Sequence, residues 1–249
     1  MNDLNKCRAG IAFVFLNVLL TFFLELSGIR DIQYYELSYG VADGLVSCLN
    51  VRIAGMCGVL SAITAEIVLF RNDFKMNYVI RSSSRCGLFL GQIVEAAVFS
   101  LASTLAVQAV TVMTYLFYSG TLIDWNCKSS VFHATLRRVS DAGFVTVLTM
   151  TTICYFTVLF SAMAVFLIMR WIFRNYLPGF VTFLLVIGYD SIEIDRDRLV
   201  FSATKLVSYY SDWNNPLMML VKLLLFLLMS LAIISAFSRS GFVNRGKLC

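Results

Sequence analysis

Residues 46–85 read VSCLNVRIAGMCGVLSAITAEIVLF and then RNDFKMNYVIRSSSR, a long apolar run followed by a short basic segment. A helix of about 20 apolar residues is long enough to cross the hydrocarbon core of a membrane. A second apolar run, 87–118, follows directly. The segment 71–85 between them has four cations and one carboxylate, and cationic loops are typical of the cytoplasmic face. The stretch therefore predicts two membrane-spanning helices joined on the cytoplasmic side.

The composition of the whole chain supports the same class of protein. Of 249 residues, 59% are hydrophobic and 14% are charged, whereas soluble domains have about 25% charged residues. We therefore expect an all-α integral membrane protein that forms a single domain over 1–249. The apolar run Ile11 to Ile29 is too long for the core of a cleaved signal peptide and predicts a retained first span. Six spans are expected, at residues 10–29, 46–70, 87–118, 143–170, 176–190 and 216–237.

The distribution of Lys and Arg predicts the orientation. One set of segments contains eleven cations and comprises the N-terminus, the 71–86 loop, Arg170 with Arg174, and the C-terminal tail. The opposite set contains seven cations, in 30–45, 119–142 and 190–215. Because the cation-rich side stays in the cytoplasm, both termini are expected there.

A segment of mixed polarity precedes the last span. Within 191–213, apolar residues such as Leu199, Leu206 and Tyr210 can share one face of a helix. The pattern predicts a short amphipathic segment at the outer membrane surface.

Several polar residues lie within the expected spans, where a charge costs on the order of 2.5–3.5 kcal/mol. Their depths lead us to expect an ion pair between Glu25 and Arg52 near the outer face. One interpretation is that the polar groups line a substrate or proton route, and the alternative is snorkelling with structural pairing near helix ends. The intramembrane polar candidates are Glu25, Arg52, Glu66, Gln92, Glu95 and Lys222.

Two further features concern packing. Gly55, Gly58, Ala62 and Ala65 share one helical face of the second span, which suits either packing within the chain or a dimer interface. The seven cysteines are scattered and mostly apolar in context, although a disulfide between Cys48 and Cys127 is conceivable at the outer face.

The sequence carries no recognisable catalytic motif. His133 is the single histidine, which excludes a metal site built on histidines, and no phosphate-binding GxxxxGK[ST] loop is present. If ATP is used, another chain must hydrolyse it. The basic residues are dispersed, so the sequence gives no support for nucleic-acid binding.

The layout as a whole resembles the permease subunit of an ABC transporter of the type-2 export family, which includes bacteriocin and lantibiotic immunity permeases. The resemblance is carried by the six spans, the basic link ending in Arg81-Ser-Ser-Ser-Arg85, and a short fifth span followed by the 191–213 segment. It implies a bacterial plasma-membrane exporter of a hydrophobic or amphipathic substrate, peptide or lipid-like. It also implies two ATPase partner subunits that hold ATP and Mg, and a second permease copy or sister permease.

In that family the link after the second span forms a coupling helix that docks on the ATPase. By position this helix would lie at residues 72–82 here. The residues expected to dock are Asp73, Phe74, Lys75, Met76, Tyr78, Ile80 and Arg81.

Two other classes remain open. A substrate-binding membrane subunit of an uptake system can also have six spans, but it couples through small residues on the first span, which is bulky here. An ion-coupled secondary carrier would require charges at mid-membrane or interrupted helices. The sequence shows neither of these clearly.

Overall fold

The computed structural model describes residues 3–70, 85–192, 207–208, 211, 213 and 215–239. Within them the fold is helical, and the one β-type contact is an isolated bridge between Ser38 and Ser130. The helices are α1 (Asp3–Tyr34), α2 (Val41–Ser47), the π-helix η1 (Val51–Val59), α3 (Leu60–Leu69), α5 (Arg85–Ser119), α6 (Val131–Leu136), α7 (Phe144–Phe173), α8 (Leu177–Ile192) and α10 (Pro216–Arg239).

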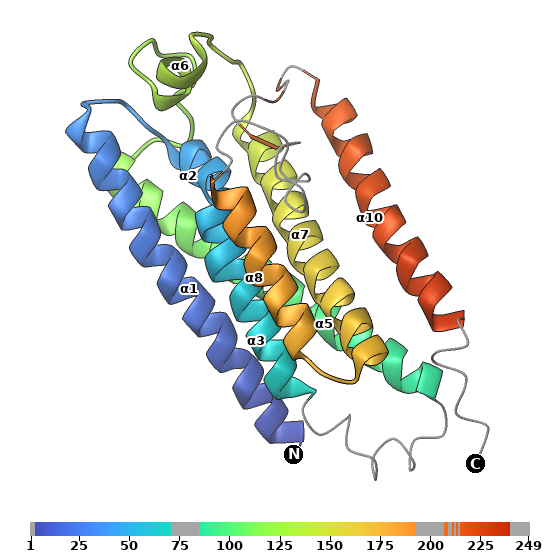
Figure 1. Cartoon of the computed structure of the whole chain (residues 1–249). Helices are drawn as coiled ribbons and strands as arrows, with labels where there is room; N and C mark the ends of the chain where they lie inside the picture. The colour runs from blue at the N-terminus through green and yellow to red at the C-terminus, as the bar shows by residue number, and fades with distance from the viewer. Residues whose placement is uncertain are drawn as a thin grey trace, which may run out of the picture.

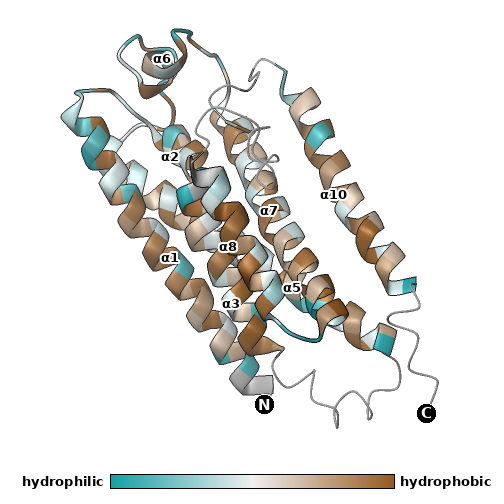
Figure 2. Ribbon diagram, viewed as in Figure 1, coloured by the Kyte–Doolittle hydropathy of each residue, from teal (hydrophilic) through white to brown (hydrophobic). Residues whose placement is uncertain are grey.

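The long helices form one bundle, with polar residues gathered mainly towards its two ends (Figures 1 and 2). Five helices of the described part are long and apolar enough to cross a membrane: Lys6–Tyr34, Arg52–Leu69, Arg85–Ser119, Phe144–Phe173 and Pro216–Arg239. The sequence prediction of an all-α membrane protein is confirmed at this level. The predicted fifth span corresponds to α8, which has 16 residues and lies alongside the others.

The second predicted span, 46–70, is not one continuous α-helix. It is preceded by α2, interrupted at residues 48–50, and resumed as η1, which continues directly into α3. The helix restarts at Asn50, whose backbone is extended (φ −62°, ψ 146°) and whose carbonyl accepts from the amides of Ile53 and Ala54. Helices with π geometry are rare and recur at functional sites, so this interruption marks a region of interest.

A cap of loop and short helix covers α2 at one end of the bundle (Figure 1). The Trp125 indole donates to Asp43 Oδ1 at 3.0 Å, and Asp43 Oδ2 accepts from the Gly40 amide at 2.9 Å. Trp125 also stacks on Phe132 with ring centroids 4.4 Å apart. The Trp125 side chain is 1% exposed and belongs to this cap.

Most of the two predicted surface segments, the coupling helix and the amphipathic segment before the last span, lies outside the described residues. Residues 72–82, the predicted coupling helix, lie outside the described residues, as does most of 191–213. In the second segment, Val207 and Trp213 are described, and both are buried. The Trp213 ring lies 5.1 Å from that of Trp125, so the end of this segment packs on the cap.

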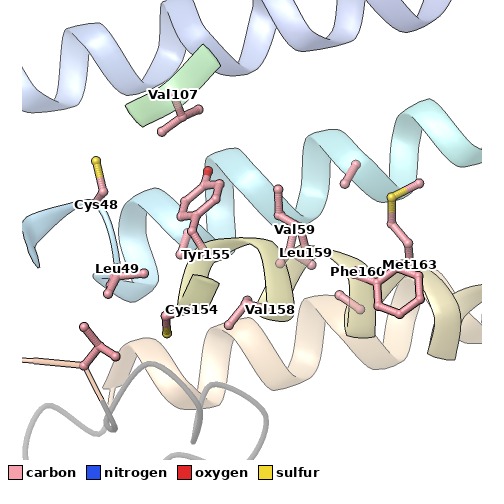
Figure 3. Close-up of a cluster of buried hydrophobic side chains, with 14 of the residues drawn as sticks. Cys48, Leu49, Val59, Val107, Cys154, Tyr155, Val158, Leu159, Phe160 and Met163 are labelled. Atoms are coloured by element: carbon pink, nitrogen blue, oxygen red, sulfur yellow. The ribbon is translucent and has the colours of Figure 1, made fainter. Parts of the chain in front are cut away.

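The α7 helix supplies more of the buried apolar core than any other helix of the described residues. Its side chains pack against η1 and α5, as shown for Tyr155, Leu159 and Met163 in Figure 3. The small residues of the second span face this core: a Cβ added to Gly58 would lie 2.7 Å from the Tyr155 hydroxyl and 3.2 Å from Leu159 Cδ2. This stripe is therefore used for close packing within the chain, the first of the two alternatives.

Candidate functional site

The buried face of α1 is polar. Most of α1 exposes large apolar side chains, but Asn17, Thr21 and Glu25 are 1%, 0% and 1% exposed. Residues four apart lie above one another on a helix, so these three form a single stripe. The first span thus meets the rest of the bundle through polar groups.

This stripe faces α5. The Thr111 hydroxyl donates to Glu25 Oε1 at 2.5 Å. Nearer the start of both helices, Lys6 Nζ lies 3.8 Å from Glu95 Oε2. These two contacts establish that α1 and α5 run side by side in the same direction.

The register then places other polar residues opposite one another. Between the two contacts, Thr21 is level with 107–110 of α5 and Asn17 with 103–106. The buried polar residues of α5 in these windows are Ser103, Thr104 and Gln108.

The interruption of the second span and α7 complete the group. The Cys48 thiol, at the interruption, donates to Glu25 Oε1 at 2.8 Å and lies 2.9 Å from Thr111 Oγ1. Figure 3 shows the Tyr155 ring reaching from α7 towards Cys48 and Val107. The Tyr155 hydroxyl lies near the Asn17 amide without hydrogen-bond geometry.

We call this group the polar seam. It contains Asn17, Thr21, Glu25, Cys48, Ser103, Thr104, Gln108, Thr111 and Tyr155.

Many atoms of the polar seam have no hydrogen-bond partner within the described residues. They are Asn17 Oδ1 and Nδ2, Thr21 Oγ1, Glu25 Oε2, Ser103 Oγ, Gln108 Oε1 and Nε2, and Tyr155 Oη. Leaving a buried polar group unsatisfied costs about 1–3 kcal/mol. The concentration of such atoms along one line marks the polar seam as the candidate site, because native cores rarely tolerate them without a bound group or a function.

Chemically, the polar seam combines one carboxyl with hydroxyl and amide groups inside an apolar bundle. It has no metal-type cluster of three or more His, Cys, Asp or Glu side chains among the described residues. The arrangement suits binding or passage of a polar or charged group.

The predicted Glu25–Arg52 ion pair is wrong. Glu25 is hydrogen-bonded to Cys48 and Thr111, and among the described residues no ion pair joins it to Arg52. Arg52 and Lys222 are both exposed on the bundle surface. The reason is the interruption at 48–50, which places Cys48 rather than Arg52 against α1. The thiol is a free one, so no Cys48–Cys127 disulfide forms.

The candidates at the other end of the bundle are held by α7. Arg170 is 7% exposed and donates to the backbone carbonyls of Glu66 at 3.5 Å and Phe70 at 3.3 Å. Its charge also acts on the buried Glu66 carboxyl. Gln92 accepts from the Trp171 indole at 2.9 Å. The Glu66 backbone and the Gln92 side chain thus connect α3 and α5 to α7, away from the polar seam. Both Glu66 carboxyl oxygens are buried without a hydrogen-bond partner within the described residues.

Glu95 borders a groove between α1 and α5. The groove has a volume of about 840 Å³ and is lined almost entirely by apolar side chains, including Ile11, Val14 and Val98. The Lys6–Glu95 ion pair lies among its lining residues.

Sequence reasoning missed most of the polar seam. The prediction of intramembrane site residues rests mainly on charged side chains. It therefore does not include the neutral residues Asn17, Thr21 and Gln108. The four-residue spacing of Asn17, Thr21 and Glu25 was a usable signal, because it places the three on one helical face.

Comparison with protein-family models, with curated proteins and with solved structures gives no match.

Proposed function

We propose that this chain is the membrane-spanning subunit of a transporter, arranged like the permease of an ABC exporter and driven by ATP that separate subunits hydrolyse. The observation that carries the proposal is the polar seam, since buried polar groups inside a membrane bundle are costly and typically serve a substrate or ion path. Eight buried polar atoms without a hydrogen-bond partner within the described residues would only destabilise a bundle that served as a membrane anchor.

The proposed topology has six crossings, with α8 as the fifth. At about 1.5 Å per residue, the 16 residues of α8 extend about 24 Å, somewhat less than the hydrocarbon core of about 30 Å. The start of α1 and the end of α10 lie at the same end of the bundle (Figure 1), which requires an even number of crossings. If α8 also crosses, the five longer helices and α8 give six crossings, an even number.

Cysteine labelling tests the orientation. Cys7 and Cys127 are both exposed. Cys7 lies near the start of α1, and Cys127 lies in the connection between α5 and α6. In intact cells, a membrane-impermeant maleimide should label Cys127 and leave Cys7 and Cys249 unlabelled. Labelling of Cys7 or Cys249 from outside would overturn the cytoplasmic placement of the termini.

The groove between α1 and α5 supports a hydrophobic or amphipathic substrate. Its walls are apolar, and Lys6 and Glu95 supply polar contacts among them. Such a groove suits a lipid-like molecule or a hydrophobic peptide that enters sideways from the membrane.

The proposed motor contact is the segment 72–82, which lies between the end of α3 and the start of α5. It would dock on one of two ATPase subunits. A second permease copy or sister permease would complete the transporter in a bacterial plasma membrane. To test this, the full chain is purified from its own membranes and ATP hydrolysis by the purified material is measured. We expect the F74A/Y78A double variant to lose this hydrolysis, whereas the control S82A/S83A retains it.

Equal hydrolysis by F74A/Y78A and wild type, with equal transport in vesicles, would contradict the motor contact.

A second candidate function is an ion-coupled carrier. The interrupted second span favours it, because discontinuous helices near buried polar groups are typical of ion and substrate sites in such carriers. Flux into proteoliposomes of the chain alone distinguishes the two. Flux driven by an ion gradient without ATP would favour the carrier over the ATP-driven exporter.

A further inference from the structure

We propose that the polar seam binds one monovalent metal cation, Na⁺, between Glu25, Thr21 and Gln108. All the proposed ligands come from this chain, so the site needs no partner subunit. Cation binding goes beyond the proposed ATP-driven transport, and either proposal can hold without the other.

The charge of Glu25 is the first argument. A buried charge is normally paired with an opposite charge or a metal. No Lys or Arg of the described residues is paired with Glu25, and the intramembrane Arg52 and Lys222 are exposed. Of the other buried carboxyls, Asp43 has both oxygens in hydrogen bonds, from Trp125 and Gly40. Both Glu66 oxygens lack a hydrogen-bond partner within the described residues, but the charge of Arg170 acts on that carboxyl. Among the described residues, Glu25 is the buried carboxyl that combines an oxygen without a hydrogen-bond partner with no cation acting on it.

The second argument is that the two carboxyl oxygens of Glu25 have different surroundings. Oε1 accepts from Cys48 and Thr111, which orients the carboxyl group. Oε2 is buried and has no partner within the described residues. An oriented carboxylate with one oxygen left over is the arrangement of a metal ligand supported by its neighbours.

Neutral oxygen donors lie one helical turn from the contact between Glu25 and Thr111. Thr21 is one turn before Glu25 on α1, and Gln108 is one turn before Thr111 on α5, so both are on the same side of Glu25. Thr21 Oγ1 and Gln108 Oε1 are likewise buried and without partners in this part of the chain. Carboxylate, hydroxyl and amide oxygens are the ligands that hard cations prefer.

The single carboxylate points to a single charge. Sites for Ca²⁺ commonly use several carboxylates, and no cluster of three acidic, His or Cys side chains occurs among the described residues. One Glu with neutral oxygens balances a monovalent ion. The interruption at 48–50 adjoins this point, as in transporters where broken helices hold Na⁺.

The test is binding of ²²Na⁺ to the purified full chain in lipid nanodiscs, with choline chloride keeping the ionic strength constant. Wild type should show saturable binding of one ion per chain. E25Q should weaken binding by at least about tenfold, and T21V and Q108L by a smaller factor. The matched control is D31N, which removes an exposed carboxylate two turns further along α1 and should bind like wild type.

A second measurement guards against misfolding of E25Q. Its thermal unfolding should stay cooperative, and added Na⁺ should raise the midpoint of wild type and D31N but not of E25Q, because a ligand stabilises only the state it binds. Saturable binding that is equal in wild type and E25Q would overturn the proposal. So would the absence of saturable Na⁺ binding with a midpoint that responds only to pH, since the group held by Glu25 would then be a proton.

Discussion

The helices α1 and α7 have nearly the same length and hydropathy but opposite positions in the bundle. In the most apolar stretch of α1, 17% of the residues are buried within the protein, whereas in that of α7 61% are buried. The contact face of α1 is the polar stripe of Asn17, Thr21 and Glu25, while α7 contributes large apolar side chains such as Leu159 and Phe166. Two equally apolar helices therefore differ in where their apolar side chains lie: those of α1 are mostly exposed on the bundle surface, and those of α7 are mostly buried.

The difference follows from the solvent. Lipid tails are as apolar as a leucine, so in a membrane the apolar surface of a helix gains little from burial against protein. Packing of close surfaces and satisfaction of polar groups decide instead which face turns inward. For α7 the deciding factor is close packing against the glycines of η1, and for α1 it is polar contact with α5.

The largest effect should come from truncating the same residue type on the two helices. Phe166 is fully buried on α7, with its ring 6.4 Å from Phe183, whereas Phe15 is 64% exposed on α1. F166A should lower the free energy of unfolding by about 3–5 kcal/mol through the cavity it leaves. F15A should change it little. Equilibrium unfolding in mixed micelles measures both, and similar losses would remove the contrast between the helices.

A smaller effect is expected where α7 meets η1. In G58A the added methyl would lie 2.7 Å from the Tyr155 hydroxyl, so overpacking should cost about 1–3 kcal/mol. Removing that hydroxyl gives room, and Y155F should therefore recover much of the loss in the double variant. The double-mutant cycle measures this coupling. Additive effects of G58A and Y155F would mean that the hydroxyl does not limit the approach.

The polar stripe of α1 should respond in the opposite direction. Both amide atoms of Asn17 are buried without partners within the described residues, so N17L should raise the free energy of unfolding by about 1 kcal/mol. If the seam serves transport, the same variant should reduce flux. A clear loss of stability in N17L would show that Asn17 has a structural partner.

The smallest effect is expected at the surface contact between α1 and α5. The Lys6–Glu95 pair is 3.8 Å apart, with the Glu95 side chain 51% exposed. Exposed ion pairs contribute about 0–1 kcal/mol, so K6M should stay within that range. The measurement is the same unfolding assay at low and high salt. A loss above 2 kcal/mol by this measure would contradict the assignment of the pair as a weak surface contact.

The sequence predictions were right for features that depend on one segment and wrong for features that depend on contacts between segments. Apolar runs of 20 or more residues predicted α1, α5, α7 and α10, because length and hydropathy are properties of each segment alone. The interruption at 48–50 was missed, since no Gly or Pro stands there and the helix stops for tertiary reasons: Cys48 is held by Glu25 and Thr111. The Glu25–Arg52 ion pair failed for this reason, as it assumed an unbroken span.

The sequence by itself determined that the chain is a helical membrane protein, because burial in lipid demands long apolar helices whatever their neighbours. The excess of cations on one set of connections predicts the orientation in the membrane, and this stays a prediction. Only the tertiary structure decided which face of each helix turned inward and which polar groups met. Those choices depend on the register between α1 and α5 and on the close approach of α7 to Gly58, contacts between residues far apart in the chain that local pattern does not encode.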